Sequence, residues 1–217
     1  MPNGGDFFIV LTMMIYNKKI PAEDYLKDPF AVATDVLLGA YLCSNIGGKF
    51  TVGKITELEV YIGAEDKACH AYLNRKTARN AVMFEQGGLA YVFFVYGMYN
   101  QFNVVVSREG EANAILIRGL EPVAGIDVMA ERRKNDNLFN LTTGPGKLCQ
   151  ALGITREHNG IDLGGDMLWL SPRTDRIQWE ATPRIGIDYA EEYRDKPWRF
   201  VIKDSKFVSK QPKRKEV

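Results

Sequence analysis

The sequence predicts a single mixed α/β domain of the α+β kind, with a curved, mostly antiparallel sheet and helices packed around it. Three observations support this fold class. The chain has 217 residues, of which 46% are hydrophobic and 25% charged, enough to bury one core. Two pairs of strand-like stretches are joined by turns short enough for hairpins. No internal repeat or long low-complexity linker divides the chain.

The individual elements follow from hydrophobic spacing and turn residues. Residues 7–16 are expected to form a strand or a packed arm, because this apolar stretch is too short to span a bilayer and no basic residue precedes it. Helices are expected over 30–37, 123–133 and 148–152. Strands are expected over 40–44, 55–61, 91–95, 102–106 and 114–118, with shorter strands near 167–170, 185–187 and 198–202.

The strand over 55–61 has an unusual polar face. Strict alternation places Thr56, Leu58 and Val60 on one side, and Glu57, Glu59 and Tyr61 on the other. An unpaired carboxylate is costly to bury, so these acids either face water or are held for a chemical task. A solvated outer face is the simpler interpretation of this strand taken alone.

The predicted hairpin over 91–106 has apolar side chains at its tip. Its connection, residues 96–101, contains Gly97 and carries Tyr96, Met98 and Tyr99. Large exposed apolar side chains lose hydrophobic stabilisation unless something covers them. Either the tip folds back onto its own domain, or it contacts a partner. The sharper form of the second alternative is that the tip inserts as a wedge into a stack of bases.

Charge and composition exclude several classes of site. The formal net charge is +1, so any footprint for a polyanion must come from local segregation of 28 basic and 27 acidic residues. Three distant cysteines and two histidines argue against a disulfide framework or a zinc site and are typical of a reducing cytoplasm. We expect no metal and no cofactor. The stretch 142–147 lacks the spacing of a nucleotide-hydrolysing loop, although a glycine-rich helix start with Lys147 can bind one phosphate.

Several short motifs occur in a specific order along the chain. Each motif is weak alone, but their ordered set resembles the alkyladenine (3-methyladenine) DNA glycosylase family from about residue 28 to 208. We therefore expect an N-terminal arm or extension over 1–27, a glycosylase domain over 28–208 and a basic tail over 209–217, in which residues 210–215 are solvated. The motifs are the stretches 57–63, 65–70, 77–80, 91–93, 96–99, 102–103, 116–122 and 144–152.

The resemblance implies an activity and a chemical mechanism. Members of this family excise alkylated or deaminated purines, such as 3-methyladenine, 7-methylguanine, hypoxanthine and ethenoadenine, from double-stranded DNA and leave an abasic site. They flip the damaged nucleotide out of the duplex because its glycosidic carbon is otherwise inaccessible. By residue matching, Glu59 activates the attacking water and stabilises the sugar cation, and Arg118 holds the water and Glu59. Glu57 does not match the catalytic acid and is expected to be structural or exposed.

The same matching assigns the residues that bind the base and the DNA. Tyr61 and Phe93 are expected to sandwich the base, His70 to hydrogen-bond it or its sugar-phosphate, and Asn103 to reject guanine by a clash with its exocyclic amine. The family often has Tyr where this chain has Phe93, so a hydroxyl is missing there while stacking is kept. On the hairpin, Tyr96 is expected to fill the gap in the DNA stack, with Met98 and Tyr99 beside it. The candidates for DNA backbone contacts are Arg75, Lys76, Arg79 and Lys147.

Two other functions are compatible with parts of the sequence. The first is a module that recognises distorted DNA without chemistry, against which the predicted pairing of Glu59 with Arg118 argues. The second is a metal-assisted phosphodiesterase that uses Glu57, Glu59 and Asp66, for which the chain offers no further ligand cluster. We expect a monomer with no membrane association, located in the cytoplasm and associated with the nucleoid in a bacterium, or nuclear in a eukaryote.

Overall fold

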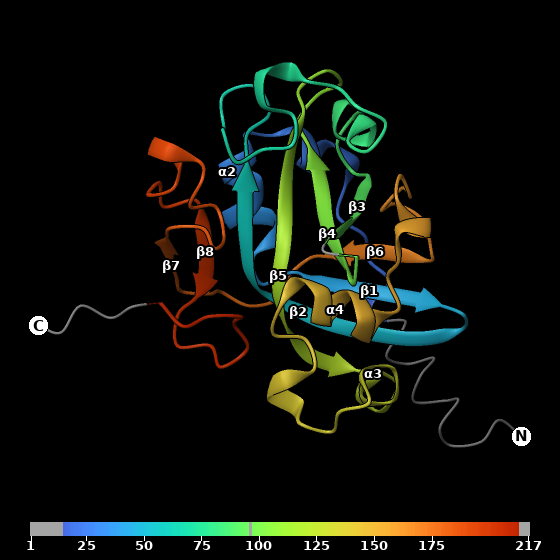
Figure 1. The fold of residues 1–217 in the computed structure, drawn as a ribbon. Coiled ribbons are helices and arrows are strands. Elements are labelled where there is room, and N and C mark those ends of the chain that lie inside the picture. The colour runs from blue at the N-terminus through green and yellow to red at the C-terminus, as the bar shows by residue number, and fades with distance from the viewer. Residues whose placement is uncertain (1–14, 96, 213–217) are drawn as a thin grey trace, which may run out of the picture.

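A single curled sheet organises the molecule, and its strands pair antiparallel (Figure 1). The computed structural model describes residues 15–95 and 97–212. Within these residues the sheet has eight strands in the order β3-β4-β5-β2-β1-β6, with β8 paired to β2 and β7 paired to β8. The strands are β1 Tyr41–Ile46, β2 Lys49–Tyr61, β3 Ala90–Val95, β4 Tyr99–Val106, β5 Asn113–Ala124, β6 Leu168–Ser171, β7 Trp179–Thr182 and β8 Arg199–Ile202.

Helices are short and lie around the sheet. Asp28 caps α2 (Pro29–Ala31) by accepting hydrogen bonds from the backbone N–H groups of Phe30 and Ala31. None of the helices in the described part of the chain is both long and apolar enough to cross a bilayer. The segments are η1 Ala22–Leu26, α2 Pro29–Ala31, η2 Val32–Leu37, η3 Tyr72–Asn74, η4 Ala81–Phe84, α3 Ile126–Arg133, η5 Leu138–Asn140, α4 Pro145–Leu152, η6 Arg156–His158 and η7 Glu191–Tyr193.

The long strand β2 is the centre of the fold. β5 runs along one edge of it, while β1 occupies the other edge from Lys49 to Lys54 and β8 takes over that edge from Glu57 to Glu59. Register shifts in the pairing of β2 with β5 fall on both sides of Glu57. Bulges of this kind bend a strand and increase its twist, which explains how β2 serves two halves of the sheet.

The core consists of one main cluster formed by sheet and helix residues and of smaller clusters beside it. The main cluster includes Leu58 and Val60 from β2, together with α4 residues such as Leu148. A second cluster, around Met83 and Tyr91, supports the partly buried rings of Tyr61 and Phe93. The single mixed α/β domain with a curled antiparallel sheet is therefore confirmed.

Some predicted elements differ from the structure. Residues 185–187 form an irregular loop rather than a strand, and β7 was not predicted because its exposed residues show no apolar alternation. The strand expected to end at Arg118 continues as β5 to Ala124, so α3 begins later than predicted, at Ile126. The α4 helix begins at Pro145 and includes Lys147. Most of the N-terminal stretch 7–16 lies outside the described residues.

Candidate active site

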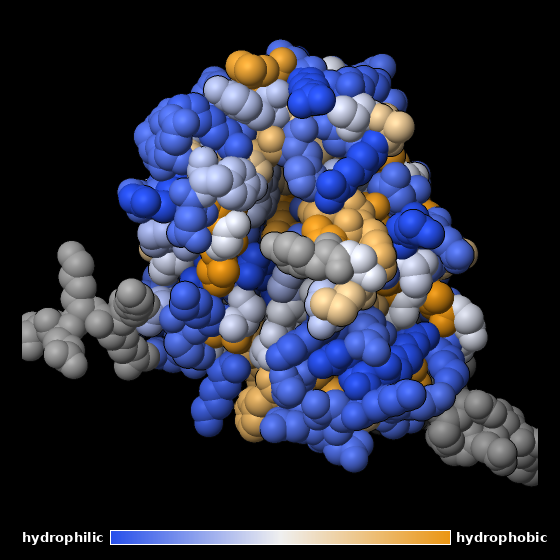
Figure 2. Space-filling model, viewed as in Figure 1, coloured by the Kyte–Doolittle hydropathy of each residue, from blue (hydrophilic) through white to orange (hydrophobic). Residues whose placement is uncertain are grey.

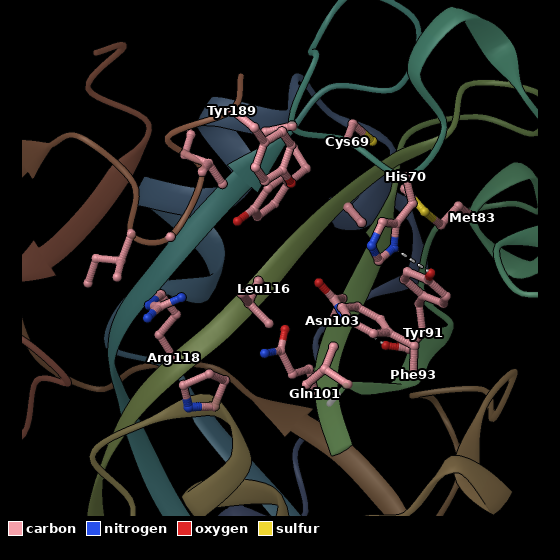
Figure 3. A pocket seen from close by; sticks show the side chains of 18 residues that line it. Cys69, His70, Met83, Tyr91, Phe93, Gln101, Asn103, Leu116, Arg118 and Tyr189 are labelled. Carbon is pink, nitrogen blue, oxygen red and sulfur yellow. Dashed lines mark hydrogen bonds between the residues drawn. The ribbon is translucent and has the colours of Figure 1, made fainter. Parts of the chain in front are cut away.

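A cavity of about 360 Å³ lies on one face of the sheet, and it gathers five of the predicted residues (Figure 3). Tyr61, His70, Phe93, Asn103 and Arg118 all line it. Figure 3 shows Arg118 on one side of the cavity and His70, Tyr91 and Phe93 on the other. In the space-filling view, apolar atoms surround a hollow within a largely hydrophilic face (Figure 2).

Tyr61 and Phe93 reach the cavity from strands that are not neighbours. Tyr61 ends β2, while Phe93 lies on β3, and the sheet order places β4 and β5 between them. At the usual strand spacing this separates their backbones by roughly 14 Å. Two aromatic side chains that point inward across this distance leave space for a flat ring between them.

Glu59 lies directly behind the cavity wall and is fully buried. Its Oε2 accepts hydrogen bonds from the Tyr61 hydroxyl at 2.8 Å and from Arg118 Nη1 at 3.3 Å. Its Oε1 accepts one from the backbone N–H of Ile185 at 2.8 Å. All three donors line the cavity. Within the described residues the carboxylate is thus held by three donors, and a carboxylate has about four lone-pair sites, so one acceptor position remains.

The groups that bond Glu59 keep their protons. Burial and the charge of Glu59 raise the pKa of Tyr61, so its phenol stays a hydrogen-bond donor. Burial alone lowers the pKa of Arg118, but the charges of Glu59 and Glu57 outweigh burial and leave its pKa raised. The Tyr61 hydroxyl and the Arg118 guanidinium therefore both remain hydrogen-bond donors to Glu59.

Glu57 is also fully buried, so a solvated outer face for this strand is wrong. Its Oε1 accepts hydrogen bonds from Arg199 Nε at 2.7 Å, from the Ser209 hydroxyl at 2.8 Å and from Arg118 Nε at 3.3 Å. Glu57 was expected to be either structural or exposed. Its burial excludes exposure, so the structural role remains. Arg118 is consequently shared by both carboxylates of β2.

The opposite wall is an aromatic cluster with a neutral histidine. Nδ1 of His70 lies 2.9 Å from the Tyr91 hydroxyl, and the rings of His70 and Phe93 meet edge to face at 4.6 Å. The guanidinium of Arg79 lies 5.0 Å from the Phe93 ring centre. Desolvation, together with the charge of Arg79, lowers the pKa of His70 from 6.5 to about 4.

The remaining predicted residues that the structure describes lie outside the cavity. Met98 and Tyr99, at the tip of the β3–β4 hairpin, are 65% and 47% exposed, while Tyr96 lies outside the described residues. Arg75, Lys76 and Arg79 are exposed, and Lys76 approaches Glu85 at 3.9 Å. Lys147 is half-buried and donates a hydrogen bond to the Asn140 side chain.

Sequence reasoning missed several cavity residues. Tyr91 and Gln101 are two positions from Phe93 and Asn103 on their strands, so the period-2 rule could have found them. Ile185 and Tyr189 come from the loop that follows β7. No motif marks that loop, and its irregular backbone gives no periodicity to detect.

The three carboxylates of the phosphodiesterase alternative do not converge. Asp66 forms an ion pair with Arg184, and Glu57 pairs with Arg118 and Arg199. Among residues 15–95 and 97–212, no group of three or more Asp, Glu, His or Cys side chains is placed to hold a metal ion.

An aromatic-walled cavity beside a buried, arginine-paired carboxylate fits a hydrolase that binds a flat ring and cleaves a bond to it. Comparison with known proteins is more specific: residues 23–206 match the methylpurine-DNA glycosylase family, and the chain belongs to this family.

Bacterial relatives cover most of the chain. A Clostridium novyi (strain NT) protein is 46% identical over 89% of this chain and 99% of its own length. A Chlamydia felis protein is 47% identical over 87% of this chain and 100% of its own length. A Natranaerobius thermophilus protein is 42% identical over 88% of this chain and 98% of its own length. All three carry the name "Putative 3-methyladenine DNA glycosylase".

Proposed function

We propose that this chain is a monofunctional DNA glycosylase that flips alkylated or deaminated purines out of double-stranded DNA and hydrolyses the N-glycosidic bond. Its substrates include 3-methyladenine, 7-methylguanine, hypoxanthine and ethenoadenine, and its product is an abasic site. It acts as a monomer without a cofactor, in the bacterial cytoplasm at the nucleoid. Membership of the methylpurine-DNA glycosylase family supports the reaction class.

The observation that carries the mechanism is the burial of Glu59 as a hydrogen-bonded anion beside the cavity. A carboxylate at this position accepts a proton from the attacking water, and its charge favours the oxocarbenium-like sugar as the base departs. Arg118 bonds Glu59 at 3.3 Å and limits the movement of its carboxylate. The fourth acceptor position of the carboxylate is where the water binds.

The aromatic walls account for recognition of a purine. Tyr61 and Phe93 stack on the two faces of the flipped base, which every purine offers regardless of its lesion. His70 is neutral, and we assign the Tyr91 hydroxyl, 2.9 Å from Nδ1, as the donor in the bond between them. The histidine proton is then on Nε2, from which it hydrogen-bonds the base or its sugar-phosphate.

Asn103 supplies discrimination against normal guanine. Its Nδ2 donates to the Tyr91 carbonyl at 3.0 Å, which fixes the side chain on the cavity wall. A rigid amide at this position clashes with the exocyclic amine of guanine, while hypoxanthine lacks that amine. Replacement of the fixed side chain by Ser should relax this discrimination.

The β3–β4 hairpin holds the DNA open. Tyr96 fills the gap left by the extruded nucleotide, and Met98 and Tyr99 contact the neighbouring bases. The exposure of two large apolar side chains next to the cavity supports this assignment, because such surfaces need a partner. Arg75, Lys76 and Arg79 contribute backbone contacts; Lys147 does so after release from Asn140.

The decisive experiment replaces Glu59 by Gln, which keeps the shape of the side chain but removes its charge. Single-turnover release of hypoxanthine from duplex DNA should fall by about 10²–10⁴-fold, with the affinity for lesion DNA retained. Glu121→Gln, an exposed residue on β5, is the matched control and should leave the rate unchanged. Wild-type excision by the Glu59 variant would disprove the assignment of the base.

A panel of the four lesions then separates the alternatives. Base release from hypoxanthine, ethenoadenine, 3-methyladenine or 7-methylguanine duplexes excludes a binding module without chemistry. Release that continues in the presence of a chelator excludes a metal-assisted reaction. The relative rates give the lesion preference of a site with Phe93.

A further inference from the structure

A buried ion pair between Arg184 and Asp66 lies behind the part of the cavity wall that Tyr61 forms, and the proposed mechanism does not use it. Arg184 and Asp66 are 5% and 0% exposed. Nη2 of Arg184 donates to Asp66 Oδ1 at 2.8 Å, and Nη1 donates to Oδ2, so the pair is bidentate. The two residues come from the turn after β2 and the loop after β7, which the pair joins.

The same guanidinium is also tied to β2 itself. Nη1 of Arg184 donates to the Val60 carbonyl at 2.9 Å, between Glu59 and Tyr61 in the sequence. Nε of Arg184 is buried and has no hydrogen-bond partner in the described part of the chain.

Arg184 supports the ring of Tyr61 from behind. The guanidinium carbon lies 4.6 Å from the Tyr61 ring centre and 5.0 Å from that of Trp198. A guanidinium stacked on an aromatic face restricts the ring, because its planar fork is held by the ion pair and the carbonyl. Tyr61 also lines the cavity, where it is proposed to stack on the base.

Arg184 is linked to Glu59 through one peptide group. The N–H that donates to Glu59 Oε1 belongs to Ile185, so it is part of the peptide bond that follows Arg184. This loop has no strand pairing to hold that peptide, and Gly186 beside it has a φ of +76°. Anchoring the Arg184 side chain therefore fixes the donor on Glu59.

We propose that Arg184, held by Asp66, is a positioning residue for excision: it aligns both the Tyr61 ring and the Ile185 N–H that orients Glu59. This inference rests on the proposed function. Removal of this Asp66–Arg184 clamp should slow the chemical step more than it weakens DNA binding. A misplacement of about 1 Å in a reacting group costs on the order of 10²-fold in rate.

Two variants test the Asp66–Arg184 clamp and are chosen so that the domain still folds. The double variant Asp66→Asn with Arg184→Gln replaces the ion pair by a neutral hydrogen-bonded pair, so neither charge is left buried alone. Arg184→Lys keeps the positive charge but loses the planar guanidinium that bonds both oxygens of Asp66. Arg194→Gln is the control, since Arg194 pairs with Asp195 on the exposed part of the same loop region.

The measurements are single-turnover excision of hypoxanthine, affinity for a duplex with an abasic site, and fluorescence of ethenoadenine during flipping. In the folded double variant we expect a loss in rate of about 10²-fold, affinity within about threefold and a smaller fluorescence change on flipping. Arg184→Lys should recover part of the rate, and Arg194→Gln should match the wild type. A rate within twofold of the wild type in the folded double variant, or a loss explained by weaker affinity, overturns the proposal.

The outcomes also separate this inference from the proposed function. If the wild-type protein excises none of the four lesions, the proposed function fails and the positioning role fails with it. If the wild type is active and Glu59→Gln is inactive while both Arg184 variants excise normally, only the positioning role is wrong. The melting temperature of each variant shows whether a lost rate reflects unfolding.

Discussion

His70 keeps its neutral form across the physiological pH range. Its pKa of about 4 is below its value in an unfolded chain, so between these two values the unfolded chain binds a proton that the folded one does not. Its contribution to stability is therefore present above about pH 6.5 and is lost as the pH falls toward 4. The side chain is partly exposed, so this contribution is small.

The charge of Arg79 gives a testable prediction for His70. We expect Arg79→Met to raise the pKa of His70, because a nearby positive charge no longer opposes protonation. NMR titration resolves this readily in a chain with two histidines. Arg75→Met is the matched control from the same loop and should leave the titration of His70 unchanged; an equal shift in both variants would contradict the assignment to Arg79.

Glu57 provides a second prediction at this scale. It is buried against Arg118, Arg199 and Ser209, so Glu57→Gln leaves two arginines without their shared anion. We expect the free energy of unfolding to fall by about 3–5 kcal/mol. Urea denaturation measures it, with Glu131→Gln at the exposed Lys49–Glu131 pair as a control that should lose less than about 1 kcal/mol. Equal losses in the two variants would rule out a structural role for the buried charge.

The hairpin formed by β3 and β4 is the element whose function can be isolated most cleanly. Met98 is 65% exposed at its tip, so Met98→Ala should leave the melting temperature unchanged. If the tip contacts the DNA stack, the same change should weaken binding of lesion duplex severalfold, measured in the Glu59→Gln background. Met167→Ala is the control, since Met167 is 49% exposed elsewhere. Unchanged affinity in the Met98 variant would remove the hairpin from the DNA interface.

Elements differed in how well periodicity predicted them. β3 and β4 contain nearly continuous runs of aromatic and β-branched residues, and the predicted boundaries of both agree with the structure to within a few residues. β7 and the loop after it were not found, because exposed polar residues and irregular backbone have no period. That loop nevertheless supplies Ile185 to Glu59 and Arg184 to Tyr61.

The C-terminal segment is part of the domain rather than a fully solvated tail. The carbonyl of Phe207 accepts a hydrogen bond from Thr56, and Ser209 bonds Glu57 through its hydroxyl and its N–H. Arg199 donates to the Lys210 carbonyl. Ser209 and the Lys210 carbonyl are thus bonded to the domain while the Lys210 residue is exposed, and residues 213–217 lie outside the described part of the chain.

Truncation of the C-terminus tests whether this segment stabilises the whole molecule. A chain that ends at Phe207 loses the bonds from Ser209 to the buried Glu57, and hydrogen bonds to charged groups contribute about 1.5–3 kcal/mol each. We expect its free energy of unfolding to fall by about 3 kcal/mol in urea titrations. A chain that ends at Pro212 keeps these bonds and should match the full-length protein. Identical stability of the two truncated chains would show that the segment is not anchored.

Local pattern determined the fold class, the strand that carries Glu59 and the hairpin that carries Met98 and Tyr99, because strand alternation and turn residues act over fewer than ten neighbouring positions. Tertiary structure alone decided that both faces of that strand are buried. The reason is that the compensating groups are distant in sequence: Ile185 bonds Glu59 across 126 positions, and Ser209 bonds Glu57 across 152. A buried carboxylate is stable only with such partners, and no periodicity connects them.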